Sequence, residues 1–259
     1  MGLINPSTLS GWLRPHSIEW YEQLSKLQGK YAYTWNTSYV DPNGESIFDK
    51  EVARMIVNKK VLDVGCGHGE YTIQCSLLAE EIVGFDVTDD FIIMAEKNNQ
   101  PNVTFVKGST KYGFPFEKDE FDCAYIRKGP TSSYPLLEQV VKKGGNILGL
   151  HPGDDLGKEL PILFPNLFED SNGSPILDAV RRKLDLSRFK SIDIESVNST
   201  EYLQSPLDVL KLRCFGQPPQ IYDFLKEQNL VDISRIFERN ATKQGLPLTF
   251  LHYLVRVTV

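Results

Sequence analysis

The chain has 259 residues, of which 41% are hydrophobic and 24% are charged, as in an ordinary globular protein of one large or two small domains. Its net charge of −6 at pH 7 disfavours a nucleic-acid binder unless basic residues gather locally. The four cysteines form no Cys-x-x-Cys pair, which argues against a zinc ribbon and a disulfide framework, and we expect no metal site. They are Cys66, Cys75, Cys123 and Cys214.

The amino-terminal residues do not resemble a targeting segment. They lack the basic start and apolar stretch of a secretory signal, and Pro6 stands where an N-myristoylation motif needs serine or threonine. No apolar run approaches the roughly 18 residues that span a bilayer. We therefore expect a cytoplasmic protein without membrane contacts.

Short apolar runs alternate with helical patterns through most of the chain. Helices are expected at residues 17–28 and 45–58, and an aromatic stretch at residues 31–35 lies between them. Strands are expected at 61–64, 81–86, 103–106, 121–125 and 145–151, with helices at 70–79, 89–98 and 133–143, the last of which holds Lys142 and Lys143 before Gly144. This alternation predicts an α/β fold with a parallel sheet and helices on both faces.

The second half is less regular. An irregular segment is expected at 154–170, a strand at 191–197, and helices beginning at Ser174 and Ser205 and covering 220–228 and 232–239. The last residues alternate strictly, which predicts a long terminal strand with one apolar face. That face would carry Leu251, Tyr253, Val255, Val257 and Val259.

The most informative segment is a glycine-rich turn between an expected strand and an expected helix. Residues 61–70 read VLDVGCGHGE, so glycines at 65, 67 and 69 follow the strand directly. Glycine lets the backbone turn sharply and leaves room for a ligand, and the helix start adds free N–H groups. The turn therefore predicts a ligand site at the carboxyl end of this strand.

Two acidic residues indicate which ligand the turn accepts. A dinucleotide-binding pattern would place its third glycine at position 70, where this chain has Glu70. A carboxylate there opposes a diphosphate but suits a ligand that carries an ammonium group. Asp86 ends the next strand about 20 residues later, where a carboxylate accepts the ribose hydroxyls of a nucleoside. The alternative is that Asp86 only caps a helix or a turn.

Together these segments resemble the class I S-adenosylmethionine-dependent methyltransferases. Residues 61–70, 83–87 and 106–110 match the first three motifs of that family, and 121–126 and 143–148 match two later strands. The resemblance covers about residues 45–152 and can be extended to the carboxyl terminus. It implies a doubly wound, mostly parallel sheet of seven strands whose last strand is antiparallel. It also implies one domain, with a helical cap (1–58), a cofactor-binding half (59–152) and a second half with helical insertions (153–259).

The resemblance further implies S-adenosyl-L-methionine as cofactor. Asp63 would lie near its ammonium group, Asp86 would bind its ribose, and Val87 would flank its adenine. Ser109 replaces the acidic residue usual in the third motif, which makes the adenine contact weaker. The implied cofactor contacts are Asp63, Gly65, Cys66, Gly67, Gly69, Asp86, Val87, Ser109, Thr110 and Ile126.

Catalytic residues are less apparent. A sulfonium methyl group is already activated, so the protein mainly has to hold the acceptor in line with it, although an oxygen or carbon acceptor would also need a base. Arg127 and His151 are candidates because they follow the fourth and fifth strands. The alternatives are a solvated Arg127 and a His151 bonded to local backbone. Tyr33, Trp35 and Arg127 are candidates for contacting the acceptor, although aromatic residues also serve as packing.

The acceptor cannot be identified from these motifs, and we expect a small molecule and no nucleic-acid partner. Residues 126–130 lack the Asn/Asp-Pro-Pro-aromatic pattern of enzymes that methylate exocyclic amines or amides. RNA-base methylation is the alternative, because residues 200–214 faintly resemble guanine-N1 ribosomal-RNA methyltransferases, although their zinc ribbon is missing. The glycine spacing disfavours a nicotinamide oxidoreductase, and a cofactor-binding module without catalysis stays open.

Overall fold

The computed structural model describes residues 2–98, 100–169 and 173–259. The chain forms two compact units, each built from three separate segments. The large unit comprises Pro42–Asp154, Gly173–Val197 and His252–Val259. The small unit comprises Met1–Asp41, Asp155–Asn172 and Asn198–Leu251.

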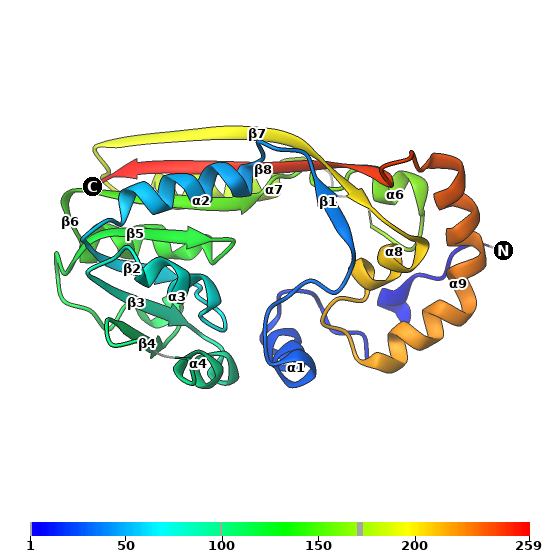
Figure 1. The fold of residues 1–259 in the computed structure, drawn as a ribbon, viewed down its shortest axis with the longest axis horizontal. Helices are drawn as coiled ribbons and strands as arrows, with labels where there is room; N and C mark the ends of the chain where they lie inside the picture. The colour runs from blue at the N-terminus through cyan, green and yellow to red at the C-terminus, as the bar shows by residue number, and fades with distance from the viewer. Residues whose placement is uncertain (1, 99, 170–172) are drawn as a thin grey trace. The chain divides into compact units, whose positions relative to one another are not determined.

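The strands form one mixed, mostly parallel sheet in the order β1-β7-β8-β6-β5-β2-β3-β4 (Figure 1). They are β1 (Thr37–Tyr39), β2 (Lys60–Val64), β3 (Glu81–Asp86), β4 (Val103–Lys107), β5 (Phe121–Arg127), β6 (Val141–Pro152), β7 (Ser191–Leu203) and β8 (Leu246–Thr258). The expected antiparallel last strand is confirmed, since β8 runs antiparallel to β6. The sheet has eight strands instead of seven because β1, which is too short to show an alternating pattern, pairs with the end of β7.

Helices lie between most of the strands, as the sequence predicts. They are α1 (Ile18–Gln28), α2 (Gly44–Met55), α3 (Glu70–Ser76), α4 (Asp89–Glu96), α5 (Tyr134–Val140), α6 (Glu159–Leu163), α7 (Pro175–Leu184), α8 (Pro206–Arg213) and α9 (Pro219–Asn240). Short 3₁₀ helices cover Pro6–Thr8, Thr110–Tyr112 and Thr131–Ser133. Among the described residues, no helix combines the length and the apolar character needed to cross a bilayer.

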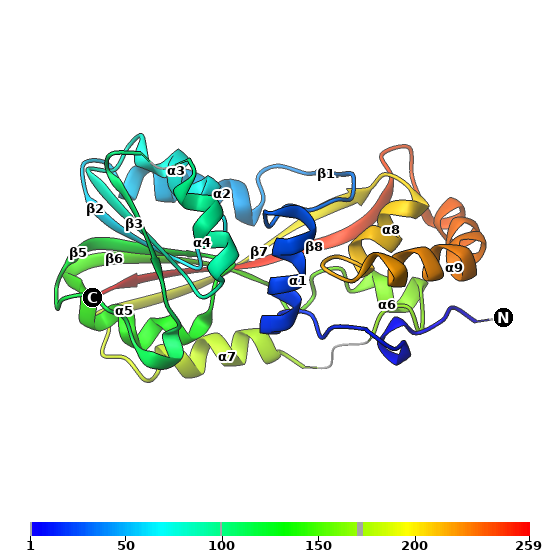
Figure 2. The same ribbon diagram turned by 90° about the horizontal axis from the view of Figure 1, so that it is seen from below.

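The sheet of the large unit is covered on both faces. Figure 2 shows α2, α3 and α4 on one face and α5 and α7 on the other. Successive residues of β2 serve opposite faces: Val61 packs in the cluster under α2 to α4, and Leu62 packs in the cluster with α5 and α7. Strands buried on both faces become nearly continuous apolar runs, which is why a short motif such as VLDV marks a strand here.

The order of the strands places a ligand site at the end of β2. From β2 the chain builds β3 and β4 on one side and then returns to build β5 and β6 on the other side. Open α/β sheets bind ligands at the carboxyl ends of the strands where the direction of winding reverses. The glycine turn after β2 lies at this position.

The expected end of the helix before β6 was wrong. Helix α5 ends at Val140, and Val141 already pairs with Phe121 of β5, so Lys142 and Lys143 lie in a strand and not in a last helical turn. The register then shifts before Asn146 pairs with Cys123. The extra residues form an irregularity in β6, in which Gly144 adopts a φ of 79°.

Helix α9 also differs from the prediction, since it is one helix and not two. The residues between the two expected helices, 229–231, include no glycine or proline. Asn229, the polar residue among them, is buried, and its side chain bonds to the Ile4 backbone N–H at 3.0 Å and carbonyl at 3.4 Å. A satisfied buried amide does not interrupt a helix.

The terminal strand, β8, is long, as predicted, but the prediction of a single apolar face was wrong. In the first part of β8 the buried residues are Leu246, Leu248 and Phe250, whereas Leu251 is only partly buried. From His252 to Val255 every residue is buried. A strand that is covered on both faces loses the alternation that would identify one buried face.

Candidate functional site

The turn between β2 and α3 contains three glycines with left-handed backbone conformations. The φ angles of Gly65, Gly67 and Gly69 are 81°, 55° and 78°. A Cβ atom added to Gly65 would lie 2.9 Å from the Gly129 Cα, and one added to Gly69 would lie 2.6 Å from the Phe105 Cζ. A Cβ atom added to Gly67 would meet nothing within 4 Å. Two glycines are therefore needed for packing, and Gly67 leaves open space in which a ligand can approach the backbone.

Asp86 orders this turn from the end of β3. Its Oδ2 accepts a hydrogen bond from the Gly67 N–H at 2.9 Å, and its Oδ1 accepts one from the Thr88 N–H at 2.8 Å. Burial raises the pKa of Asp86 above its ordinary value. The Thr88 hydroxyl and the Val87 N–H also act on this carboxylate and favour its charged form, so hydroxyl groups of a ligand would share its oxygens with these donors. The next side chain, Val87, is 42% exposed.

Asp63 is the second carboxylate of the site and is almost completely buried, with 2% exposure. Its Oδ2 accepts hydrogen bonds from the Thr72 Oγ1 at 2.6 Å and from the Tyr125 hydroxyl at 2.9 Å. Burial raises the pKa of Asp63 to about 7, although the two hydroxyl donors oppose this shift. No group in the described part of the chain donates to Oδ1, which leaves that oxygen for a cationic ligand.

Of the remaining predicted cofactor residues, Cys66 lies in the turn and Ile126 lies in the core. Ser109 and Thr110 follow Gly108, whose N–H bonds to the Asp86 carbonyl at 2.8 Å. The Cys66 sulfur would lie 3.0 Å from a Cβ at Gly84, so it packs against β3. Ser109 accepts a hydrogen bond from the Lys111 N–H at 3.3 Å, and Thr110 shares one of 2.7 Å with the Ser132 hydroxyl. Ile126 is fully buried in the cluster with α5 and α7, where its side chain serves packing.

Arg127 is tied to α2 by acidic side chains. Its Nε lies 3.1 Å from the Asp49 Oδ1, and its Nη2 lies 3.1 Å from the Glu45 Oε2. The Lys128 amine pairs with the same Glu45 carboxylate. Burial opposes ionisation of Glu45, but the adjacent Lys128 and Arg127 outweigh it and lower its pKa. The two cations at the end of β5 are thus matched by two carboxylates.

His151 is buried, with 2% exposure, and its Nε2 lies 2.8 Å from the Tyr134 hydroxyl. Burial lowers its pKa to about 4. The imidazole is therefore neutral at pH 7 and is a weak base. This geometry favours a histidine bonded within the protein, here to a side chain and not to local backbone.

Tyr33 and Trp35 belong to the small unit, where they form part of an aromatic cluster. Their rings stack with a centroid distance of 4.4 Å, and both lie edge-on to Phe215. The Trp35 Nε1 donates to the Glu201 Oε1 at 3.3 Å. These contacts favour the packing hypothesis for Trp35, whereas Tyr33 keeps 41% of its surface exposed.

Thr72 and Tyr125 are site residues that sequence reasoning missed. Thr72 lies in the first turns of α3, and nothing in the pattern distinguishes it from other polar helix residues. Tyr125 carried a usable signal, because the parallel register pairs it directly with Asp63 across β2 and β5. Aligning the ends of the two strands would have identified the contact.

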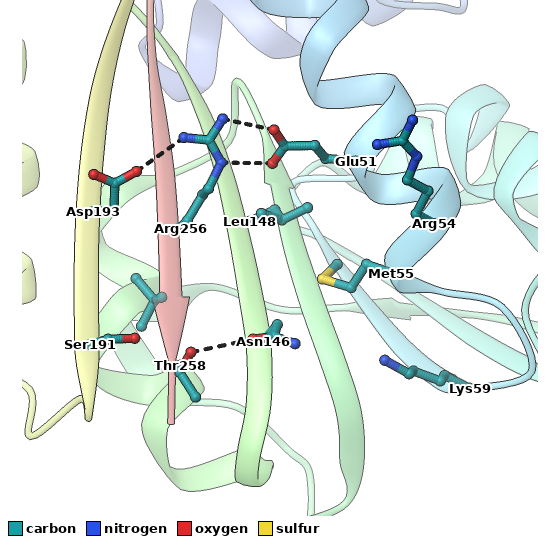
Figure 3. Close-up of a pocket in the computed structure, with 11 residues that line it drawn as sticks. Glu51, Arg54, Met55, Lys59, Asn146, Leu148, Ser191, Asp193, Arg256 and Thr258 are labelled. Atoms are coloured by element: carbon teal, nitrogen blue, oxygen red, sulfur yellow. Dashed lines mark hydrogen bonds and ion pairs between the residues drawn. The ribbon is translucent and has the colours of Figure 1, made fainter.

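A separate groove of about 500 Å³ lies on the large unit beside the carboxyl-terminal half of α2. Figure 3 shows Arg256 at its centre, bonded to Glu51 and Asp193, with Met55 and Leu148 nearby. Its described lining residues include none of the predicted site residues, and acidic partners neutralise its central arginine. We assign it no ligand. The described part of the chain also brings together no group of His, Cys, Asp and Glu side chains suited to a metal ion.

The glycine turn lies in a segment that matches a known family. Residues 61–145 match a family model described as a methyltransferase domain. A tRNA U34 carboxymethyltransferase of Nautilia profundicola is 22% identical over 245 residues, which covers 82% of this chain and 80% of that protein.

Solved structures share the fold at low sequence identity. A functionally unknown protein from Deinococcus radiodurans superposes with a TM-score of 0.60 at 19% identity, covering 91% of this chain and 96% of the other. For a putative methyltransferase from Bacillus halodurans the TM-score is 0.52 at 18% identity, with 81% and 96% covered.

Proposed function

The chain belongs to the superfamily of class I S-adenosylmethionine-dependent methyltransferases, and on this premise we propose that it methylates a small-molecule acceptor. S-adenosylmethionine is the cofactor of this superfamily. The observation that carries the proposal is the open backbone at Gly67, whose N–H bonds to Asp86, with the Asp63 and Asp86 carboxylates both near the adjacent Cys66. We infer that the cofactor binds at this turn.

The residues of the turn suit the chemistry of the cofactor. The carboxylate oxygens of Asp86 would accept the two ribose hydroxyls. The Oδ1 of Asp63 would accept hydrogen bonds from the ammonium group, and the exposed Val87 would pack on adenine. When bound, the cofactor supplies a methyl group that its sulfonium already activates. The chain's own task is then to hold an acceptor in line, and orientation of this kind contributes roughly 7–11 kcal/mol. We assign no general base.

Two features of charge support a small molecule over a nucleic acid as acceptor. The net charge is −6, which opposes association with a phosphate backbone. The cations at the end of β5, Arg127 and Lys128, are neutralised by Glu45 and Asp49 and so offer little to phosphates.

RNA is the second candidate acceptor. It is favoured by the similarity to a tRNA-modifying enzyme over 82% of this chain. Binding of RNA through its backbone weakens steeply with salt, with a slope set by the number of phosphates contacted. Measured affinity for transfer RNA at several salt concentrations therefore discriminates between the two acceptors.

Transfer of radiolabelled methyl groups tests the proposed function directly. The purified protein is incubated with methyl-labelled S-adenosylmethionine and cell extract, which is then separated into small-molecule, RNA and protein fractions. We expect label in the small-molecule fraction, and none with the Asp86→Ala variant. Label in the RNA fraction would establish the second candidate, and no label in any fraction would contradict methyl transfer.

We expect the affinity for S-adenosylhomocysteine, which carries the same ammonium group as the cofactor, to fall when the pH is lowered from 8 to 6. The pKa of Asp63 is raised to about 7, so the carboxylate takes up a proton across this range and loses the charge that attracts the ammonium group. Calorimetric titration at pH 6, 7 and 8 measures the effect. The Asp63→Asn variant should bind weakly at every pH, and a pH-independent affinity of the wild type would contradict this role.

A further inference from the structure

A fully buried tyrosine lies against Asp63. Tyr125 has 0% exposure, sits opposite Asp63 in the register of β5 and β2, and donates its hydroxyl proton to the Asp63 Oδ2 at 2.9 Å. Thr72 donates to the same oxygen at 2.6 Å. Both donors thus bond to Oδ2 of the carboxylate. No donor among the described residues bonds to Oδ1.

The surroundings of Tyr125 allow it little movement. Its ring meets the Tyr71 ring edge-on, with centroids 5.6 Å apart and an interplanar angle of 84°, and the Phe48 ring lies on another side at 6.4 Å. The Cys75 thiol lies near the Tyr125 and Tyr71 hydroxyls. A rotamer fixed by packing holds its hydroxyl, and through it the carboxylate, in one place.

We propose that Tyr125 is a positioning residue for cofactor binding, which favours the charged form of the Asp63 carboxylate and holds it with one oxygen turned to the ammonium group. This inference rests on the proposed function, because it requires the cofactor to bind at the glycine turn. A hydrogen bond donated to a carboxylate stabilises the charged form. Removing the donor therefore favours protonation of Asp63.

Other groups around Asp63 also influence its protonation. Burial and the nearby Asp86 oppose its negative charge, whereas Thr72 and Tyr125, on α3 and β5, and the more distant Arg127 favour it. Two thiols also face this region, Cys66 from the turn and Cys75 from α3, and their pKa values are raised by burial, so both are neutral near pH 7. The pKa of Asp63, about 7, places the change of its charge between pH 6 and pH 8.

The test is calorimetric titration of the Tyr125→Phe variant with S-adenosylhomocysteine between pH 6 and pH 10. The wild type should show a bell-shaped profile. Its acid limb is set by Asp63. Its alkaline limb is set by the ligand's α-amino group, whose pKa lies above the value of about 8 of a peptide amino terminus because the ligand's own carboxylate stabilises the ammonium form. In the variant the acid limb should move up by about one pH unit, which makes binding about fivefold weaker at pH 7 and less than about twofold weaker at pH 8. The alkaline limb should not move.

Tyr134→Phe is the matched control, because Tyr134 is also a fully buried tyrosine but its hydroxyl contacts His151 instead of Asp63. Its profile should follow the wild type. 5′-Methylthioadenosine, which lacks the ammonium group, should bind wild type and Tyr125→Phe equally at every pH. If Tyr125→Phe does not fold, Thr72→Val removes the other donor and should move the acid limb in the same direction.

The outcomes separate this inference from the proposed function. If the wild type binds neither ligand at any pH, the proposed function is wrong. If the wild type binds S-adenosylhomocysteine but the variants that fold keep its acid limb, the positioning role is wrong. Weaker binding of 5′-methylthioadenosine to Tyr125→Phe would also overturn it, because that loss would indicate a general structural role.

Discussion

Replacing Asp86 with alanine is expected to weaken binding of S-adenosylhomocysteine at least about 100-fold. Hydrogen bonds to a charged acceptor contribute roughly 1.5–3 kcal/mol each, and two ribose hydroxyls would lose theirs. The variant also loses the acceptor for the Gly67 N–H, which orders the turn. Calorimetric titration at pH 8, where Asp63 is charged, measures the change.

Asp89→Ala is the matched control for this prediction. Asp89 is exposed in the first turn of α4, three residues further along the chain, and pairs with Lys107 and not with the turn. Its removal should leave the affinity unchanged. If Asp86→Ala bound the ligand as tightly as Asp89→Ala does, Asp86 would be only a turn residue.

Replacing Gly67 with alanine is expected to abolish measurable cofactor binding while the protein stays folded. The new Cβ would meet no protein atom within 4 Å, so packing is preserved. The left-handed backbone, with a φ of 55°, costs an alanine roughly 1–2 kcal/mol of stability. The methyl group would occupy the space through which we infer that the ligand approaches the backbone. Thermal unfolding and calorimetric titration measure the two effects separately.

Gly144→Ala separates backbone strain from the loss of ligand space. Gly144 has a φ of 79°, and a Cβ there would also meet nothing within 4 Å, but it lies near the start of β6 and not at the turn. Its alanine variant should lose similar stability and keep full affinity. Equal affinities in the Gly67→Ala and Gly144→Ala variants would contradict a ligand at Gly67.

Most of the fold was predictable because apolar runs and breakers alternate regularly in the large unit. The strand at 81–86 and the helix start after Thr88 were found as expected. The errors arose where tertiary contacts override local pattern. Lys142 and Lys143 suit a helix end, but pairing of Val141 with β5 draws them into a strand. Two helices were expected at 220–228 and 232–239, but Asn229 between them is bonded to the Ile4 backbone and α9 is continuous.

The part of the candidate site that lies in or beside the glycine-rich segment at residues 61–70, or at the end of the next strand, was predictable. The glycines, Asp63 and Asp86 follow from the strand ends and lie together in the structure. The partners that set their properties lie far away in sequence: Tyr125 is 62 residues from Asp63, and Glu45 is 82 residues from Arg127. A single sequence gives no measure of such distant contacts unless strand register is assigned. The charge-paired state of Arg127 was therefore not foreseen.

The most direct test of the central claim is a crystal structure of the protein grown with S-adenosylhomocysteine. We predict density for the ligand at the turn from Gly65 to Gly69, with both ribose hydroxyls on Asp86 and the amino group at the free oxygen of Asp63. Ligand density at any other place on the protein, with the turn empty, would contradict the account.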